Sequence, residues 1–190
     1  MIARQYPFEC GLQETLCGEA LRFKVCDQPF VQILHNGLRH WVCVSTYGCA
    51  PGEIKVIDTL FKDRLSISLK KQICCLLKHS DSSIKVTVVP VQQQSSGSVD
   101  CGGFAVAWAR KIAEEKDVLT NHAFDESQLR PHLLRSLENQ QLGRFPDVAW
   151  ETFSGKVCRR KNFKLRLHCS CRMIWLEEEE LLPNKCVIYF

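Results

Sequence analysis

The sequence predicts an α+β domain in which a small β-sheet packs against one buried helix and one surface helix. Strand-like runs at residues 31–34, 40–45 and 54–58 follow one another with turn signals between them, as in an antiparallel meander. Leucine and isoleucine recur at helical spacing over residues 65–77, with lysines left for water. Residues 101–114 are apolar almost all round, which is typical of a helix at the centre of a domain.

Three further segments complete the expected domain. Residues 84–90 return to strand character, and residues 126–137 are predicted to form another helix. The Gly-Arg-Phe-Pro run at 143–146 ends the pattern. The first thirty residues show no long period, so we expect loops with one short helix there.

Length and composition limit the class of protein. A chain of 190 residues can bury about 70% of its unfolded surface as one domain. We expect that domain at residues 1–148, followed by a tail at residues 149–190. Hydrophobic residues make up 45% of the chain, yet no apolar stretch approaches the roughly 20 residues of a membrane helix, and the first residues carry no secretion signal. We therefore expect an intracellular protein of the nucleus or cytoplasm with no membrane partner.

The cysteine content and the net charge limit the class of protein further. Twelve cysteines without a secretion signal are expected to be reduced thiols, mostly small buried hydrophobes such as Cys43, Cys74 and Cys75. The formal net charge of +4 is too small to indicate nucleic-acid binding by itself. Residues 151–190 hold 8 Lys and Arg against 5 Asp and Glu, so the positive surplus belongs mainly to the tail.

One cysteine stands apart because of its position. Cys101 follows the polar run from Gln94 to Asp100 and begins the predicted buried helix, while His40 and Asp58 stand at the start and end of two predicted strands. A helix N-terminus and a nearby imidazolium lower the pKa of a thiol, and a carboxylate holds an imidazole in one tautomer. Singly, each residue has a simpler explanation in packing or at the surface. Together they indicate nucleophilic catalysis by cysteine.

The ordered set resembles a known enzyme family. The order His40, Asp58, Cys101, with Trp41 after the histidine and Asp-Cys-Gly around the cysteine, is similar to the ubiquitin-like-protein (SUMO/sentrin-type) cysteine proteases, relatives of the adenovirus protease. The resemblance covers roughly residues 5–146. It implies a papain-like fold of the ubiquitin-like protease type, with a central mixed or antiparallel sheet and the catalytic cysteine at the N-terminus of a buried helix.

The resemblance also implies a role for each matching residue. Cys101 attacks a carbonyl carbon, His40 holds the ion pair and protonates the leaving amine, and Asp58 orients His40. Trp41 forms one wall of a narrow tunnel that admits a Gly-Gly tail, and Gly102 lets the substrate backbone approach the thiol without a side-chain clash. This chemistry needs no metal ion and no cofactor.

The second oxyanion donor, beside the backbone N–H of Cys101, is a glutamine side chain in the family. It usually stands six residues before the cysteine, where this chain has Ser95. A one-residue insertion, for instance Val99, makes Gln94 the oxyanion residue and Gln93 the alternate. The simpler interpretation is that consecutive glutamines fill a solvated loop. We expect it to hold for the two glutamines that are not the oxyanion donor.

The chain departs from the family at its start. The second tunnel tryptophan of the family lies in an N-terminal Trp-Leu segment, which has no counterpart before Tyr6 and Pro7. We therefore expect an N-terminally shortened copy with a cleft that is more open on one side. The implied activity is hydrolysis of peptide or isopeptide bonds, and the implied partners are a ubiquitin-like modifier or its conjugates, or a polyprotein precursor.

The tail carries two patterns of its own. A basic run at residues 156–172 precedes an acidic run at 177–180, which is typical of a solvated, partly disordered segment whose halves attract one another. Cys169 and Cys171 resemble the first ligand pair of a truncated PHD-type zinc finger, a module found in some transposon-derived proteins. Since Cys158 and Cys186 would complete four ligands only at an unusual spacing, no metal site is assigned.

Two other functions remain open from the sequence. A catalytically inactive relative would keep the fold and bind ubiquitin-like proteins through a peptide groove. A mobile-element protein would use the basic tail for nucleic acid, with salt-dependent binding by residues 151–190.

Overall fold

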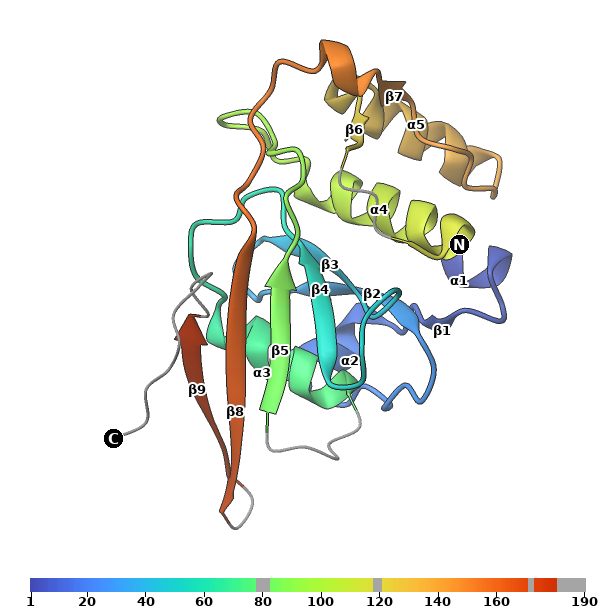
Figure 1. The fold of residues 1–190 in the computed structure, drawn as a ribbon. Coiled ribbons are helices and arrows are strands. Elements are labelled where there is room, and N and C mark those ends of the chain that lie inside the picture. The colour runs from blue at the N-terminus through green and yellow to red at the C-terminus, as the bar shows by residue number, and fades with distance from the viewer. Residues whose placement is uncertain (78–82, 118–120, 171–172, 181–190) are drawn as a thin grey trace.

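The computed structural model describes residues 1–77, 83–117, 121–170 and 173–180 of the chain. In these residues it contains a mixed sheet of seven strands and a separate pair of short strands (Figure 1). The sheet strands are β1 Cys10–Gly11, β2 Phe30–His35, β3 Trp41–Ser45, β4 Glu53–Ile57, β5 Ser83–Val88, β8 Lys161–Ser170 and β9 Met173–Glu180, and the pair is β6 Ala123–Phe124 with β7 Asp147–Val148. The helices are α1 Ile2–Gln5, α2 Thr15–Glu19, α3 Ile67–Leu76, α4 Cys101–Glu115 and α5 Glu126–Glu138, with a 3-10 turn at Trp150–Thr152.

The order of strands in the sheet is β1-β2-β3-β4-β5-β8-β9. β2, β3 and β4 form the antiparallel meander that the sequence predicts. β5 runs parallel to β4, β8 and β9 add antiparallel strands, and β1 lies parallel to β2 at the opposite edge. The protein is therefore an α+β domain with a mixed sheet, and the predicted strands at 31–34, 40–45, 54–58 and 84–90 are confirmed to within a residue or two.

The helices cover the sheet in the way their sequences require. α3 begins at Ser66, whose hydroxyl accepts a hydrogen bond from the Leu69 N–H at 3.2 Å, and in Figure 1 it lies behind β4 and β5. α4 packs on β2 and β3, and α5 packs on α4. Phe104, Trp108 and Ile112 of α4 are at most 1% exposed, as the apolar pattern of this helix predicts.

The N-terminal region has more structure than the sequence indicated. It contains two short helices, α1 and α2, and the strand β1, where loops with one short helix were expected. Tertiary contacts explain the difference, because β1 is held by pairing with β2 and α2 packs on β2 and α3. Neither feature leaves a period that is long enough to see in the sequence.

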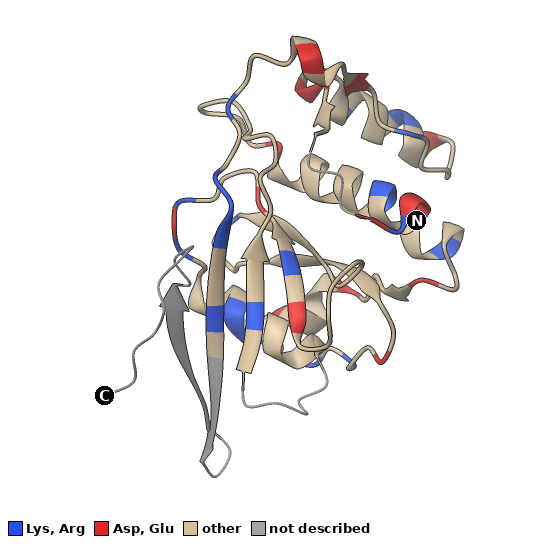
Figure 2. Cartoon of the chain, in the orientation of Figure 1, with Lys and Arg blue, Asp and Glu red and all other residues tan. Residues whose placement is uncertain are grey.

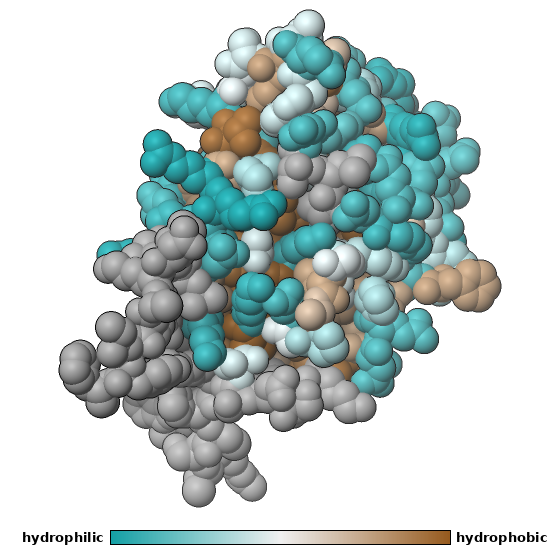
Figure 3. Space-filling model, in the orientation of Figure 1, coloured by the Kyte–Doolittle hydropathy of each residue, from teal (hydrophilic) through white to brown (hydrophobic). Residues whose placement is uncertain are grey.

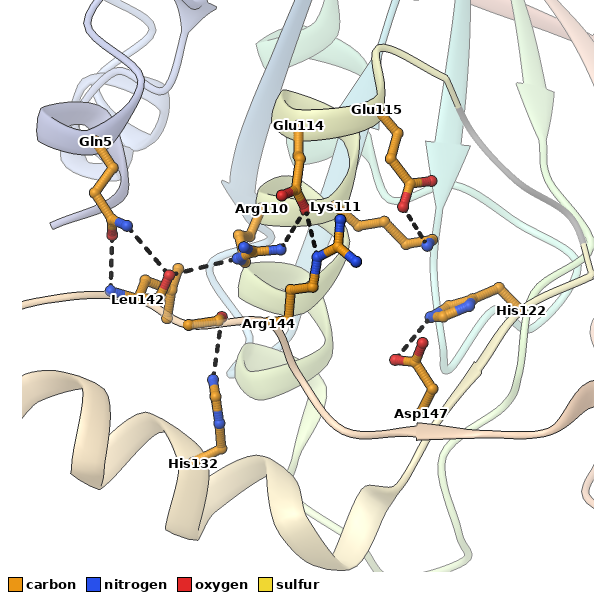
Figure 4. A network of polar contacts seen from close by, with 11 residues as sticks. Gln5, Arg110, Lys111, Glu114, Glu115, His122, His132, Leu142, Arg144 and Asp147 are labelled. Carbon is orange, nitrogen blue, oxygen red and sulfur yellow. Dashed lines mark hydrogen bonds and ion pairs between the residues drawn. The ribbon is translucent and has the colours of Figure 1, made fainter.

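A polar network ties α1, α4 and α5 to the chain that follows α5 (Figure 4). Gln5 makes two hydrogen bonds to the backbone of Leu142, and Arg110 donates to the same Leu142 carbonyl at 3.4 Å. On the α5 side, His132 Nε2 lies 3.1 Å from the Gly143 carbonyl. The ion pairs Arg110–Glu114, Arg144–Glu114, Lys111–Glu115 and His122–Asp147 extend the network. These contacts fix the position of α5 over α4.

The basic half of the predicted tail belongs to the sheet. β8 pairs with β5 along six residues, and Phe163 and Leu165 are 2% and 0% exposed within the main core. Figure 2 shows the lysines and arginines of this segment on β8 and before it. The expectation of a solvated, partly disordered segment is wrong for residues 161–165, since Phe163 and Leu165 alternate with polar residues and are buried against the core.

The two halves of the charged tail pair with one another. The register of β8 with β9 places Lys164 opposite Glu179 and Arg166 opposite Glu177, so strand pairing brings the basic and acidic runs together. Cys171 and Cys186 lie outside the described residues. Cys158 is buried with its thiol 2.9 Å from the Val89 carbonyl, so it has a backbone partner in the domain.

The surface in Figure 3 is mostly hydrophilic, with hydrophobic side chains visible mainly in hollows between polar ones. Within the described ranges, no helix combines the length and the apolar character that crossing a bilayer demands.

Replacing Leu165 by alanine tests the place of β8 in the core. Because Leu165 is fully buried, Leu165→Ala is expected to lower the free energy of unfolding by about 2–4 kcal/mol, measured by urea denaturation. The control Arg160→Ala, at an exposed residue just before β8, should change it by less than about 0.5 kcal/mol. Equal stability of the two variants would mean that β8 is not part of the core.

Candidate active site

Cys101 is the first residue of α4, and no side chain caps the start of this helix. The N-cap residue Asp100 makes no side-chain capping hydrogen bond, because its carboxylate binds Ser98 Oγ at 2.8 Å and Arg130 Nε instead. The first bond inside the helix runs from Phe104 N–H to the Asp100 carbonyl at 3.0 Å. The backbone N–H groups of the first turn and the positive end of the helix dipole are thus left for a negative charge at the thiol.

The register of two neighbouring strands brings His40 and Asp58 together. His40 directly precedes β3, Asp58 directly follows β4, and the pairing of Cys43 with Ile57 sets these two ends side by side. His40 Nε2 lies 2.7 Å from Asp58 Oδ1, and the Leu60 N–H donates to the same oxygen at 2.8 Å. Asp58 is 5% exposed, so its charge interacts with the ring through little water.

The other ring nitrogen of His40 is left for a reaction. His40 Nδ1 is buried and has no hydrogen-bond partner among the described residues. The Cys101 thiol lies beside this histidine, because it donates to the carbonyl of Arg39, the preceding residue, with a Sγ to O distance of 3.7 Å. With Nε2 held by a carboxylate, a neutral ring carries its proton on Nε2 and offers Nδ1 as the base.

The environment of His40 favours its protonated form. Burial lowers the pKa of this imidazole. The hydrogen bond and charge of Asp58, with a contribution from the Cys101 side chain, raise the pKa by more than burial lowers it. The net effect is a pKa above the ordinary value of 6.5. A ring that holds a proton near neutral pH can stabilise a thiolate and later protonate a leaving group.

The side chain of Asn36, on the turn between β2 and β3, positions this histidine. Asn36 Oδ1 accepts hydrogen bonds from Leu38 N–H at 2.8 Å and His40 N–H at 3.1 Å, and Arg39 adopts a left-handed backbone conformation with φ 67°. The Asn-Gly pair predicts the turn, but nothing in the pattern shows that the Asn36 side chain reaches His40. Asn36 is therefore a positioning residue of the site.

The three consecutive glutamines occupy three different environments. Gln92 is 4% exposed and makes two hydrogen bonds to the Phe124 backbone, so the expectation that it fills a solvated loop is wrong. Gln93 donates from Nε2 to the Asp58 carbonyl at 3.1 Å. Gln94 is 7% exposed and spans the loop before Cys101.

The bonds of Gln94 fix its side chain within that loop. Its Nε2 donates to the Ser98 carbonyl at 2.7 Å, its Oε1 accepts from Thr59 Oγ1 at 3.3 Å, and its backbone N–H donates to the Thr59 carbonyl at 3.0 Å. A primary amide has two N–H groups, so one donor on Nε2 remains after the bond to Ser98. Thr59 and Ser98 are parts of the site that sequence reasoning missed, since neither belongs to a recognisable motif.

Trp41 and Gly102 face each other at the thiol. A Cβ atom built on Gly102 would lie 3.4 Å from Trp41 Cδ1, so a side chain there would be in van der Waals contact with the indole. His35 packs against the other part of Trp41 with ring centroids 4.5 Å apart, and its Nδ1 lies 2.6 Å from Glu19 Oε1. Both predicted substrate-binding residues therefore lie at the site, beside Cys101.

Trp41, Cys101 and Gly102 line a cleft of about 520 Å³. Its walls join β2, β3, α2, α4 and α5, and two of its residues, Arg39 and Arg130, were not predicted from the sequence. The lining includes Ile33, Arg39, Trp41, Cys101, Arg130 and Leu133. A larger hollow beside Lys70 contains none of the predicted site residues, and one beside Lys156 contains Gln93 but not Cys101, so the chemistry at Cys101, and not size, identifies the site.

No protein-family model matches this sequence, and no curated protein or solved structure is significantly similar to it. In the part of the chain that the structure describes, no three His, Cys, Asp or Glu side chains are grouped as metal ligands would be.

Asp58→Asn is expected to lower the pKa of His40, as measured by NMR titration of the ring. The variant removes the carboxylate that raises the pKa and leaves the burial that lowers it. In the wild type, the stability gained from the raised pKa is fully present below pH 6.5 and is lost as the pH rises through the folded-state value. In the variant the pKa is raised less, so less stability is lost as the pH rises.

The control Asp147→Asn removes an exposed carboxylate next to His122 and should leave the His40 titration unchanged. A His40 pKa that is the same in wild type and Asp58→Asn would show that the short contact between Nε2 and Oδ1 does not carry charge stabilisation.

Proposed function

We propose that this chain is a cysteine-type peptidase of the ubiquitin-like protease type, with a papain-like fold, that hydrolyses peptide or isopeptide bonds. One observation carries the proposal. His40 is bound to Asp58 through Nε2, while its buried Nδ1 has no partner among the described residues and lies beside the thiol of Cys101 at the start of α4. An imidazole with one nitrogen oriented and the other free next to a thiol is the arrangement that nucleophilic catalysis requires.

The reaction begins with proton transfer between these two residues. His40 Nδ1 takes the proton of Cys101 Sγ, and the imidazolium is stabilised by Asp58. The thiolate adds to the substrate carbonyl carbon, and the tetrahedral oxyanion is stabilised by the Cys101 N–H and the side-chain amide of Gln94, with Gln93 as the alternate. Collapse breaks the carbon–nitrogen bond as His40 gives its proton to the leaving amine, which leaves a thioester on Cys101.

Water completes the cycle. His40 Nδ1, now neutral, takes a proton from a water molecule that adds to the thioester carbonyl. The second tetrahedral species collapses, the carboxylic acid product leaves, and the Cys101 thiolate accepts the proton from His40. Atoms balance without a metal ion or a cofactor, since one water is consumed for each amide bond that is cut.

The substrate that this proposal favours ends in Gly-Gly before the cut bond. Gly102 and Trp41 lie close together, and Gly102 has no side chain that would fill the space beside the indole. Such a narrow space suits a substrate segment made of glycines. A ubiquitin-like modifier, its conjugates or a polyprotein precursor in the nucleus or cytoplasm are the partners that go with it. Nucleic-acid binding by the tail remains the alternative for a mobile-element protein.

An inactive relative that binds ubiquitin-like proteins is the second candidate. It would need neither a base beside Cys101 nor a raised histidine pKa, and both features therefore favour the enzyme.

Cys101→Ser is expected to abolish hydrolysis while leaving the folded structure unchanged, because a hydroxyl of similar shape replaces the thiol. Activity and labelling are measured with a panel of ubiquitin-like modifiers that carry C-terminal electrophiles, followed by mass mapping of the labelled cysteine. His40→Ala should lose activity to a similar degree and Asp58→Asn to a smaller one.

Cys49→Ser is the matched control, since Cys49 is half-buried, remote from the cleft lining, and burial raises the pKa of its thiol. Unfolding of Cys101→Ser would instead mark Cys101 as a core residue. Binding of a modifier without labelling or turnover would support the inactive relative.

Gln94→Ala is expected to lower kcat by about 10²-fold with little change in KM, the usual effect of losing one oxyanion donor. Gln94→Glu keeps the shape but removes the donor, so it separates catalysis from the packing of this buried side chain when the Tm of both variants is compared. A damaging Gln93→Ala with a silent Gln94→Ala would move the oxyanion role to Gln93.

A further inference from the structure

Two arginines line the cleft that contains Cys101. Arg39 lies on the turn before β3 and Arg130 on α5, and both line the same cleft as the catalytic cysteine. Of its charged lining residues only Asp100 is acidic, so the cleft carries a net positive charge. Ile33, Leu133 and other apolar residues make up most of the remaining wall, and such surroundings strengthen the field of a charge.

Both guanidinium groups have donors to spare. Arg39 is exposed and forms no ion pair within the described residues. Arg130 uses Nε on Asp100 and one terminal nitrogen on the Val99 carbonyl at 3.1 Å, which leaves N–H groups of the other terminal nitrogen free. The Arg130 side chain is 63% exposed and that of Asp100 only 18%, so the cationic partner of this pair is the more accessible to a ligand.

The backbones that carry these arginines are fixed relative to the thiol. The Arg39 carbonyl is the acceptor of the Cys101 thiol, and the Asn36 turn holds the residues on either side of Arg39. Arg130 is held to the helix start by its bonds to residues 99 and 100. The polar network of Figure 4 fixes α5 against α4. A substrate chain that reaches Cys101 through this cleft therefore passes both cations.

We propose that Arg39 and Arg130 select substrates with an acidic side chain a few residues before the cut bond. This inference rests on the proposed function, because the family resemblance assigns the part of the cleft at Trp41 and Gly102 to residues before the cut. A carboxylate there accepts charge-assisted hydrogen bonds from the free guanidinium N–H groups, while glycines occupy the narrow part beside Trp41. The substrate is thus an acidic peptide segment that ends in Gly-Gly.

The test compares matched peptide probes that end in Gly-Gly-propargylamide, an electrophile that labels a reactive cysteine. One series carries Glu at the third, fourth or fifth position before the electrophile, and the other carries Gln at the same place. For the wild type, the rate of Cys101 labelling should be about 10-fold higher for the best Glu probe than for its Gln partner, which corresponds to about 1.4 kcal/mol. The advantage should shrink at high salt.

Arginine variants assign the preference. In Arg39→Gln/Arg130→Gln the ratio of Glu to Gln labelling should fall to about one, and Arg39→Glu should favour a Lys probe instead. Arg135→Gln, an exposed arginine on the same helix outside the cleft lining, should keep the wild-type ratio.

Equal rates with Glu and Gln probes in the wild type overturn this inference and leave the peptidase proposal standing. A preference for Glu that survives in the double variant also overturns it. If neither the probes nor a small neutral electrophile labels Cys101 faster than the eleven other cysteines, the proposed function fails and this inference fails with it.

Discussion

The hydrogen bond between His40 Nε2 and Asp58 Oδ1 is the interaction on which the site depends. It joins the start of β3 to the end of β4, so the pairing of these two strands also aligns the groups proposed to be catalytic. Because both side chains are largely buried, the bond sets the protonation of the ring and fixes which nitrogen remains for Cys101. Loss of the carboxylate would remove the main interaction that offsets the desolvation of this imidazole.

The sequence predicts the meander and the helices because each rests on a local pattern, whereas the meeting of His40, Asp58 and Cys101 is implied by the family resemblance. Alternation locates the strands, helical spacing locates α3 and α5, and an apolar run locates α4. It did not predict β8 in the sheet. Phe163 and Leu165 alternate with polar residues, as a half-buried strand requires, but the run of basic residues favoured a solvated segment. Nor did it predict Asn36, Thr59 and Arg130, whose roles come from contacts between segments far apart in the chain.

The loop of glutamines shows why such contacts matter for function. Gln92 bonds to the backbone of β6, Gln93 to Asp58, and Gln94 to Thr59 and Ser98, so one polar segment is anchored on three sides before it reaches Cys101. Buried amides remain in a structure only when their polar atoms are satisfied. Here those bonds hold the loop that leads into α4. The position of Cys101 therefore depends on glutamine side chains that the sequence pattern assigns to a solvated loop.

A chain with twelve cysteines must also keep one of them distinct. Burial raises the pKa of the Cys74 thiol to about 12, raises the pKa of Cys43 even more, and, with a contribution from Cys10, raises that of Cys26 to about 12. Thiols of this kind stay protonated and react slowly with electrophiles. Cys101 is buried as well, but its surroundings are a helix start and an imidazole, not hydrocarbon alone. Selectivity among the cysteines therefore follows from what surrounds each sulfur, and the degree of burial by itself does not decide it.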